Sequence, residues 1–512
     1  MPYPIGIDLG TTNSVVSVYR RGVAETINIE SRSTLPSVVS FRENGSVLVG
    51  QTAKARMLLD PENTVSSSKR FMGDRAKTYR INKKSLTPVN IAQIVLKKIV
   101  DSTSSALGEK VFDAVITVPA YFTEAQREDT KRAGEEAGLN VLRLIPEPTA
   151  AAIAYGLDKG KDQTIMVYDL GGGTFDVSIL IVKGNRFEVK AVGGDGRLGG
   201  DDFDKAIIAW AAEKFKAQSG IDIMSNKTIE ERKARQLLKE AAEVAKIELS
   251  QSDRAMISIP DFMGRTLDLE LTLPEYNSLI QPFLKKTADW MKSVMRDARL
   301  RTDDIDRVIL VGGSTKNRAV RELVTREIKE PYVADRVDEV VSHGAAVMAA
   351  NLFLPEEDTV PIEVSDVTGH SLGIGMFDSN IGKNEFVPII PRQTQYPCKR
   401  GILGTTHRPM QSAVLMTVYR GEDKDLSCNT RIGELKLPIV PPQNEEVFVG
   451  AIFELDEDGI IKFTAVQFPS DHRILRPIME YSREHDGNID IGVVENLIRK
   501  DAVKTKEVII KT

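Results

Sequence analysis

The sequence has few of the residues that build disulfide frameworks or metal sites. Its two cysteines, Cys398 and Cys428, lack metal-binding spacing, and its five histidines form no ligand pair at helical spacing. We therefore expect reduced thiols and no zinc site held by protein ligands. No apolar run is long enough to span a bilayer, and the first residues, MPYPI, lack the features of a secretory leader. These absences favour a cytoplasmic protein.

An excess of charge of one sign is also absent. The 68 basic and 73 acidic side chains give a formal net charge of −5, so we expect neither a nucleic acid nor a membrane surface as a partner. Hydrophobic residues make up 41% of the chain and charged residues 28%, which is typical of globular proteins. At 512 residues the chain can form several domains, each with its own core.

The most informative stretch is residues 168–176, YDLGGGTFD. It lies between two β-rich runs and predicts the turn of a hairpin. Three glycines beginning at Gly171 let backbone N–H groups close on an anion, and Thr174 adds a hydroxyl donor. Asp169 and Asp176 would repel a bare phosphate. Their presence is explained if a hydrated divalent cation lies between them and the phosphate, and Mg2+ usually keeps several waters in such a setting.

The same pattern occurs near the start of the chain, in residues 5–14, IGIDLGTTNS. Two copies of one phosphate-binding hairpin predict a duplicated domain. Neither copy is a Walker loop, because no Gly-Lys-Ser/Thr follows and the next element is a strand, not a helix. The alternative, two ordinary glycine hairpins, leaves the matching Asp-Leu-Gly and threonine positions unexplained.

Strands and helices alternate up to about residue 354, which predicts an α/β sheet domain. Thr87-Pro88 starts one helix, and Thr123 with Gln126 forms the capping box of the next. Helices are expected over residues 89–104, from 123 onward, and over 150–156, 201–218, 230–250, 274–299 and 338–352.

The texture of the chain changes after residue 354. An acidic, proline-bearing linker is expected over residues 355–366. Strand-like alternation follows and predicts an all-β sandwich over residues 367–480. Residues 481–512 are expected to form a short charged tail with one short helix, residues 493–500.

Six motifs resemble, in this order, the ATPase domain of the DnaK (heat-shock-seventy) chaperones: residues 5–14, 114–122, 147–156, 168–176, 198–204 and 310–315. Two further stretches are similar to the start and end of the peptide-binding β-sandwich of that family: residues 366–374 and 453–465. The resemblance implies an α/β fold in which a duplicated ribonuclease-H-like (actin-like) ATPase domain, residues 1–354, precedes the sandwich.

The resemblance also implies a function. The protein would hydrolyse ATP and couple hydrolysis to the binding and release of extended apolar polypeptide segments. Its ligands would be ATP or ADP, Mg2+ and, as a further ion, K+. Its partners would be unfolded polypeptide clients, a J-domain co-chaperone and a nucleotide exchange factor, and it would take part in protein folding and the stress response.

The roles of the family's site residues carry over onto the matching positions of this sequence. Lys69 would neutralise charge on the γ-phosphate and position the nucleophile, which is a task of placement and electrostatics. The catalytic set is Lys69, Glu147, Thr174 and Asp176, and the metal would be held through water by Asp8 and Asp169. The nucleotide-binding set is Gly10, Thr11, Thr12, Asn13, Gly171, Gly172, Gly173, Gly199, Gly200, Glu243, Lys246, Ser250, Gly312, Gly313, Ser314, Lys316 and Asp338.

Two further sets follow from the same resemblance. A relay between the nucleotide and the linker would use Pro119, Arg127 and Arg143. The hydrophobic slot for peptide would be lined by Ile374, Phe377, Val414, Met416 and Val449. A slot of this kind binds an extended segment by strand-like backbone hydrogen bonds around one apolar pocket.

Each assignment has a plainer alternative. Lys69 alone would be a solvated lysine, and Glu147 a first-turn acid favoured by the helix dipole. Glu243 and Lys246 have the spacing of any exposed helix pair, and Pro119 could simply end a strand. Apolar residues that alternate along strands, like those of the slot, are usually plain core.

The sequence departs from the family at the linker and beside one relay residue. Pro361 and Glu363 interrupt the apolar segment that in the family docks on the ATPase domain as an added strand. Pro146 stands where the family commonly has Asn, next to Arg143, which matches a J-domain contact. Since proline has no N–H to donate, recognition of the co-chaperone is expected to differ.

The sequence also departs in its length. Only a short tail follows the sandwich, the region between Gly73 and Leu86 is short, and the loop over residues 399–410 diverges where the family arches over its peptide. These features are similar to those of HscC-type bacterial chaperones; alternatively, the chain is cut before its lid. Without a lid, peptide exchange is expected to be fast.

Two other functions share the duplicated fold. A sugar or acetate kinase would need a catalytic carboxylate in an acceptor pocket between the lobes. An actin-like filament protein would need apolar longitudinal interfaces. Neither gives a reason for the C-terminal β-module, so the chaperone is the favoured hypothesis.

Overall fold

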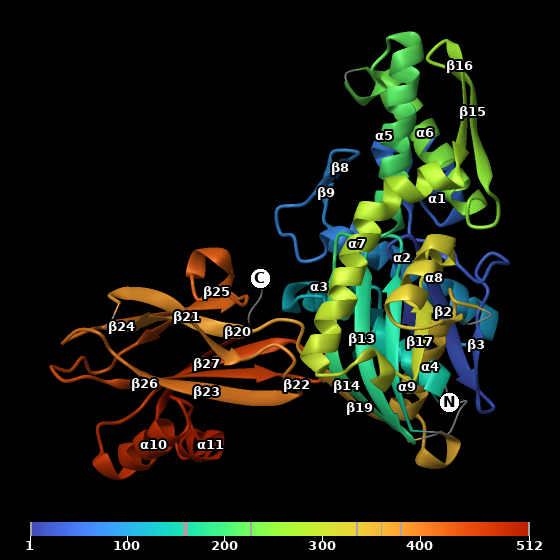
Figure 1. Ribbon diagram of the computed structural model, residues 1–512. Helices are drawn as coiled ribbons and strands as arrows, with labels where there is room; N and C mark the ends of the chain where they lie inside the picture. The colour runs from blue at the N-terminus through green and yellow to red at the C-terminus, as the bar shows by residue number, and fades with distance from the viewer. Residues whose placement is uncertain are drawn as a thin grey trace. The chain divides into compact units, whose positions relative to one another are not determined.

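The computed structural model describes residues 3–156, 162–225, 228–333, 336–359, 361–378 and 381–509. It contains two compact units (Figure 1). The first comprises Met1–Phe122 and Asp129–Val364, and the second comprises Thr123–Glu128 and Ser365–Thr512. The ends of the chain and Val360, which belongs to the expected linker, lie outside the described residues.

The first unit is built from two sheets with the same strand order. One sheet runs β11-β10-β1-β2-β3 and the other β18-β17-β12-β13-β14. In each, a three-stranded antiparallel meander is followed in sequence by two strands added in parallel beside its first strand. The strands of the first sheet are β1 (Ile5–Asp8), β2 (Asn13–Arg20), β3 (Val23–Thr26), β10 (Asp113–Val118) and β11 (Asn140–Pro146); those of the second are β12 (Gln163–Leu170), β13 (Phe175–Lys183), β14 (Arg186–Asp195), β17 (Arg307–Val311) and β18 (Tyr332–Val333). This repeated order confirms the duplicated domain that the two hairpin motifs predict, and it matches the ribonuclease-H-like fold that the resemblance implies.

Each sheet is the centre of one lobe with its own hydrophobic core. In the first lobe, the long helix α2 packs on the sheet, and Thr87 caps it as its Thr-Pro start predicts: the Thr87 side chain accepts a hydrogen bond from the Asn90 N–H. The smaller elements of this lobe are β4 (Leu35–Pro36), β5 (Val39–Phe41), β6 (Val47–Val49), α1 (Gln51–Arg56), β7 (Thr64–Val65), β8 (Tyr79–Ile81), β9 (Lys84–Leu86), α2 (Pro88–Leu107) and α3 (Glu124–Glu136), the first turn of α3 clustering with the second unit.

In the second lobe, helices and a further hairpin pack on the sheet to form the largest core of the protein. They are α5 (Gly200–Ser219), α6 (Ile229–Glu248), β15 (Arg254–Phe262), β16 (Arg265–Thr272), α7 (Leu273–Ala298) and α8 (Arg318–Glu327). Strands β12 and β13 are buried along almost their whole length, because helices cover the faces of this sheet.

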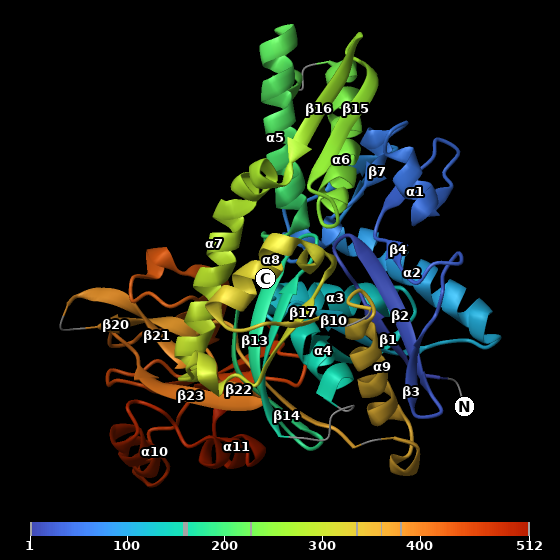
Figure 2. The ribbon, with the colours of Figure 1, turned by 45° about the vertical axis from the view of Figure 1, so that its right-hand side comes forward.

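Two small-residue helices, α4 (Glu147–Gly156) and α9 (Val340–Phe353), lie side by side in the first unit (Figure 2). A Cβ on Gly344 of α9 would lie 1.7 Å from the backbone oxygen of Ala150 in α4. A Cβ on Gly6 of β1 would lie 2.0 Å from the backbone nitrogen of Ala346. Glycine at both positions therefore lets the backbones approach more closely than any side chain would allow.

The second unit is a sandwich of two four-stranded sheets, ordered β21-β20-β24-β25 and β23-β26-β27-β28. Its core lies between them, where residues such as Ile374 and Phe453 are buried. Their strands are β20 (Leu372–Asp378), β21 (Lys383–Ile390), β23 (Cys398–Thr405), β24 (Ala413–Arg420), β25 (Thr430–Pro438), β26 (Phe448–Leu455), β27 (Ile461–Gln467) and β28 (Lys504–Ile509), and a further short strand, β22 (Gln395–Tyr396), pairs with β19 (Glu363–Val367).

The expected charged tail is instead part of the folded sandwich unit. Two helices, α10 (His472–Glu484) and α11 (Ile491–Arg499), pack on a second cluster with Ile452 and Val466. These residues alternate along β26 and β27 with core residues, so the helices cover the outer face of that sheet (Figure 1). The chain then returns as β28, which pairs antiparallel with β27. The expected helix over residues 493–500 corresponds to α11, whereas α10 and β28 were not predicted.

The linker also differs from its expectation. Residues Glu363–Val367 form strand β19, which adds to the edge of the second sheet beside β14. The Glu363 N–H donates to the Asn185 carbonyl oxygen at 3.1 Å. Pro361 precedes the strand and Glu363 is exposed, so neither interrupts it. The departure at Pro361 and Glu363 therefore does not prevent strand addition, because backbone groups form its hydrogen bonds and apolar residues beside them, such as Ile362, are buried.

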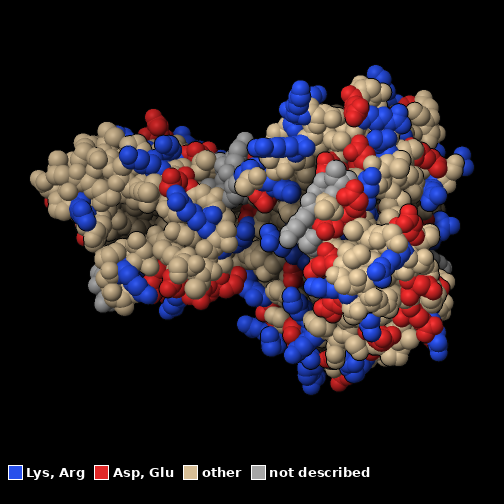
Figure 3. Space-filling view, turned by 90° about the horizontal axis from the view of Figure 1, so that it is seen from above, with Lys and Arg blue, Asp and Glu red and all other residues tan. Residues whose placement is uncertain are grey.

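Basic and acidic side chains are interspersed on the face shown in Figure 3, which agrees with the nearly balanced charge of the sequence. Within the described ranges, no helix combines the length and the apolar character that crossing a membrane would require.

Candidate active site

The two glycine turns of the duplicated hairpins lie against each other between the lobes. A Cβ on Gly172 would lie 1.9 Å from Thr12 Oγ1, and one on Gly173 would lie 2.5 Å from Thr11 Cγ2. The side chains of the first turn therefore occupy the space that a residue larger than glycine would need in the second.

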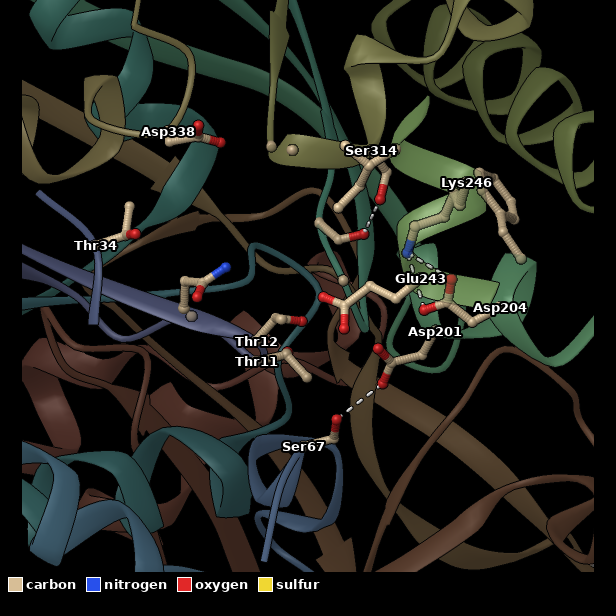
Figure 4. A pocket seen from close by; sticks show the side chains of 18 of the residues that line it. Thr11, Thr12, Thr34, Ser67, Asp201, Asp204, Glu243, Lys246, Ser314 and Asp338 are labelled. Carbon is tan, nitrogen blue, oxygen red and sulfur yellow. Dashed lines mark hydrogen bonds and ion pairs between the residues drawn. The ribbon is translucent and has the colours of Figure 1, made fainter. Parts of the chain in front are cut away.

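A cavity of about 380 Å³ opens beside these turns (Figure 4). Its wall combines backbone turns, hydroxyls, carboxylates and lysines from both lobes. The predicted residues that line it are Asp8, Gly10, Thr11, Thr12, Asn13, Lys69, Glu147, Asp169, Gly171, Gly172, Thr174, Glu243, Lys246, Ser250, Gly312, Gly313, Ser314, Lys316 and Asp338.

Four predicted residues lie behind the wall. Gly173 packs on Thr11, and Gly199 packs on the backbone of Gly172. Gly200 donates its N–H to the Gly171 oxygen at 3.0 Å. Asp176 is buried and accepts a hydrogen bond from the Tyr121 N–H at 3.0 Å. These residues shape the turn and its surroundings and do not line the cavity.

The chemistry of the site centres on buried carboxylates with a single buried lysine. Lys69 and Glu147 are 6% and 7% exposed, and Lys69 Nζ lies 2.6 Å from Glu147 Oε1. Burial, and next the charge of Glu147, raise the pKa of Asp8 to about 7. Burial, followed by the charge of Glu147, likewise raises the pKa of Asp169 well above its usual range. One lysine does not neutralise this cluster, so the site favours an added cation.

The residues fit a hydrated divalent metal. Within the described part of the chain, no three acidic, histidine or cysteine side chains converge closely enough to bind an ion directly. Asp8 and Asp169 would hold such a metal through its own waters, which is how Mg2+ commonly binds beside phosphates. Thr117 Oγ1 donates to Asp8 Oδ1 at 3.1 Å and orients that carboxylate.

The raised pKa of Asp8 predicts a pH-dependent stability in metal-free protein. Between about pH 4 and pH 7 the folded protein keeps a proton that the unfolded chain releases, so the free energy of unfolding falls as pH rises. In EDTA, the free energy of unfolding of Asp8→Asn should therefore rise by roughly 2–4 kcal/mol relative to that of the wild type when the pH is raised from about 5 to about 7.5. Urea unfolding at the two pH values measures this gain. A stability difference that does not change with pH would show that Asp8 ionises normally.

Three ion pairs lie at the cavity wall, two of them on α6 and the third between the segments that precede α8 and α9. Lys54 Nζ lies 2.9 Å from Glu243, Lys246 lies 2.8 Å from Asp204, and Lys316 lies 2.5 Å from Asp338. Ser250 lies past the end of α6, and its hydroxyl donates to the Ile247 oxygen. Burial raises the pKa of Asp204 to about 6 although Lys246 opposes this.

Several lining residues were not predicted from the sequence. They include Ser67, Asp201, Asp204, Tyr276 and Lys54. Asp201 and Asp204 follow the predicted Gly199-Gly200 pair within one helical turn, which is a signal that sequence reasoning could have used. Lys54 has no such signal, because its partner Glu243 is distant in sequence.

The three predicted relay residues lie on different elements. Pro119 follows β10, Arg143 is half-buried within β11, and Arg127 is buried on α3. The segment after β10 does reach the catalytic set, since the Tyr121 N–H contacts Asp176 and the Phe122 ring lies 5.5 Å from Lys69 Nζ.

In the sandwich, the predicted slot residues differ in burial. Ile374, Met416 and Val449 belong to the buried core, and Val414 packs against it half-buried. Phe377 is 45% exposed, and its ring lies 4.5 Å from that of His407. Of the five, Phe377 therefore presents the largest apolar surface to solvent.

The fold and the site together define a nucleotide-hydrolysing protein with a duplicated phosphate-binding domain and a separate β-sandwich unit. The chain belongs to the Hsp70 family, since the family model described as Hsp70 protein matches residues 4–507. It is similar to the proteins named chaperone protein DnaK of Thermotoga neapolitana, Thermotoga petrophila and Thermotoga maritima. Each is 43% identical over 478 residues, which cover 90% of this chain and 78% of the relative.

The family membership confirms the predicted function and fold class. The protein is an ATP-dependent molecular chaperone and an ATPase of the Hsp70 family, which binds ATP and ADP, generally with Mg2+, and acts on polypeptide clients. The kinase and filament alternatives are not favoured.

Proposed function

We propose that the predicted site residues divide the work of ATP hydrolysis between the two lobes. The observation that carries this proposal is the meeting of both glycine turns and the Lys69–Glu147 pair at one cavity. Backbone N–H groups of the turns, with the hydroxyls of Thr11, Thr12 and Thr174, would bind the β- and γ-phosphates. Glu243, Lys246 and Ser250 would bind adenosine opposite Gly312 and Gly313.

The hydrolytic step would depend on placement and electrostatics. Lys69 would donate to the γ-phosphate and hold the attacking water, while Glu147 orients the lysine. Asp176, buried behind the glycine turn, would help to organise the hydrated metal and the attacking water. Mg2+, when bound, would offset the negative charge of the phosphates, and K+ would serve as a second cation.

We also propose how the sandwich holds its client. Phe377, with His407, would contact an extended apolar segment at the surface, and Val414 would reach it from β24. Ile374, Met416 and Val449 would form the floor beneath. The exposure of Phe377 and the burial of the other residues support this division. Pro119, Arg127 and Arg143 would relay the nucleotide state of the ATPase domain to the client-binding sandwich.

Partners, location and subtype follow as parts of the same proposal. Arg143 would contact a J-domain co-chaperone, and an exchange factor would release ADP. The expected setting is the cytoplasm and the stress response. The short region between Gly73 and Leu86 supports assignment to the HscC-type chaperones.

Substitution of Phe377 tests the client contact. Phe377→Ala is expected to weaken the binding of a fluorescent, leucine-rich peptide by roughly tenfold, because an aromatic contact in a binding site often contributes more than 1 kcal/mol. Val493→Ala, which truncates a 37% exposed apolar side chain on α11, outside the predicted slot, serves as the matched control. Equal effects of the two substitutions would contradict the proposed slot.

Coupling is tested by ATP turnover with and without the same peptide and a J-domain protein. We expect the two together to accelerate turnover in the wild type and less so in Phe377→Ala. An unchanged wild-type rate would contradict the coupling, but it would not contradict the proposal that the protein binds ATP.

A further inference from the structure

Arg70 follows Lys69 in a short helical segment, Ser68–Phe71, and reaches across to the other lobe. Its Nη2 lies 2.6 Å from Asp202 Oδ2, and its Nε lies 3.8 Å from Asp201 Oδ2. The side chains of Arg70 and Asp202 are 10% and 13% exposed, so solvent screens this ion pair weakly. Arg70 does not line the cavity, whereas its neighbour Lys69 does.

The acidic partners of Arg70 are themselves fixed at the first turn of α5. Asp202 Oδ2 accepts a hydrogen bond from the Gly199 N–H at 3.0 Å, and Lys205 Nζ lies 2.8 Å from Asp202 Oδ1. Asp201 accepts a hydrogen bond from the Ser67 hydroxyl at 2.9 Å (Figure 4). The start of α5 therefore contacts the chain on both sides of Ser68 and Lys69.

Arg70 also touches the second glycine turn. A Cβ on Gly173 would lie 2.7 Å from Arg70 Nε, so the guanidinium packs directly on that turn. One side chain thus contacts the residues beside the phosphate turn, the start of α5 and, through the backbone, Lys69.

Local structure alone does not determine where Lys69 lies. The segment that bears it is four residues long and follows Ser67, whose φ of 54° lies in the left-handed region that non-glycine residues seldom adopt. Contacts from outside hold such a conformation. Glu147 anchors the Lys69 ammonium group, while Asp201 and Asp202 of the other lobe bind the residues on either side, Ser67 and Arg70.

We infer that Arg70 is a positioning residue for hydrolysis, which holds Lys69 in place by pairing with Asp202 of the opposite lobe. This inference rests on the proposed role of Lys69. Because the pair joins two lobes, it exists only while they are as close as in this structure. Arg70 therefore links closure of the cleft to the placement of Lys69 and contributes little to nucleotide affinity.

The test compares Arg70→Ala and Arg70→Lys in the full chain with the wild type. Single-turnover hydrolysis at saturating ATP and Mg2+ gives the rate of the chemical step, and titration with ATP gives the affinity. Arg70→Ala is expected to lower the rate by about ten- to a hundredfold, since a displacement near 1 Å can have an effect of that size. The affinity should change by less than about threefold, and Arg70→Lys should recover part of the rate.

Arg75→Ala is the matched control, because Arg75 also pairs with an aspartate, Asp129, at 2.8 Å and lies outside the cavity wall. Its rate should equal that of the wild type. An unchanged rate in Arg70→Ala, or a parallel loss of rate, affinity and melting temperature, would overturn the inference. Lys69→Ala measured alongside separates the two proposals: if it still turns over ATP, the role of Lys69 fails, whereas an inactive Lys69→Ala beside a fully active Arg70→Ala refutes only the positioning role.

Discussion

Replacing Lys69 with Ala is expected to lower the rate of ATP hydrolysis by about a thousandfold or more and to leave ATP affinity nearly unchanged. Lys69 is the buried cation among the carboxylates of the cavity, with its ammonium group 2.6 Å from Glu147. Without it, the site loses the side-chain cation that would offset the charge developing on the γ-phosphate and would hold the attacking water. The turns and the α6 side of the cavity remain, so the nucleotide should still bind. Single-turnover hydrolysis and ATP titration measure the two quantities.

Lys97→Ala is a suitable control for this experiment, because Lys97 pairs with Asp101 on the exposed face of α2. It should retain the wild-type rate. Turnover within about tenfold of the wild type in Lys69→Ala would mean that the lysine only stabilises the buried carboxylates. A loss of ATP binding would mean that it mainly holds the ground-state phosphate.

Replacing Gly344 with Val should destabilise the ATPase unit by about 3 kcal/mol or more. A Cβ at this position would lie 1.7 Å from the backbone oxygen of Ala150, so helices α4 and α9 would have to move apart. A Gly-to-Ala change inside a helix normally stabilises by up to about 1 kcal/mol, and even Gly344→Ala should lose stability here. Urea unfolding provides the measurement.

Gly196→Ala supplies the control, since a Cβ there meets no atom within 4 Å and the backbone is not in the left-handed region. Its stability should differ from that of the wild type by less than about 1 kcal/mol. If Gly344→Ala were as stable as Gly196→Ala, the close crossing of α4 and α9 would be an incorrect description of the helix packing.

Sequence patterns located the site because the chain repeats them. The Asp-Leu-Gly turns at Asp8 and Asp169 share one local pattern of strand, glycine turn and strand, and the fold repeats the same strand order around both. Local signals such as the Thr87-Pro88 helix start were equally readable. They depend only on near neighbours, which a sequence displays directly.

Other features depend on residues that are far apart in the chain. The pairs Lys54–Glu243 and Arg70–Asp202 form only when the two lobes meet, and no spacing rule connects them. The burial of Met416 and the exposure of Phe377 likewise depend on which strands face each other. The linker shows a further limit of sequence patterns: strand addition uses backbone groups, so a polar side chain such as Glu363 does not prevent it.

The position of β28 has a consequence for how the sandwich folds during synthesis. Strand β27 ends at Gln467 and its partner β28 begins at Lys504, with two helices between them. A nascent chain that has emerged only as far as α11 exposes β27 as an open, unpaired border, which other polypeptides can extend. The second sheet therefore stays incomplete until β28 has been synthesised, and a chain released before that point would present an open sheet edge prone to aggregation.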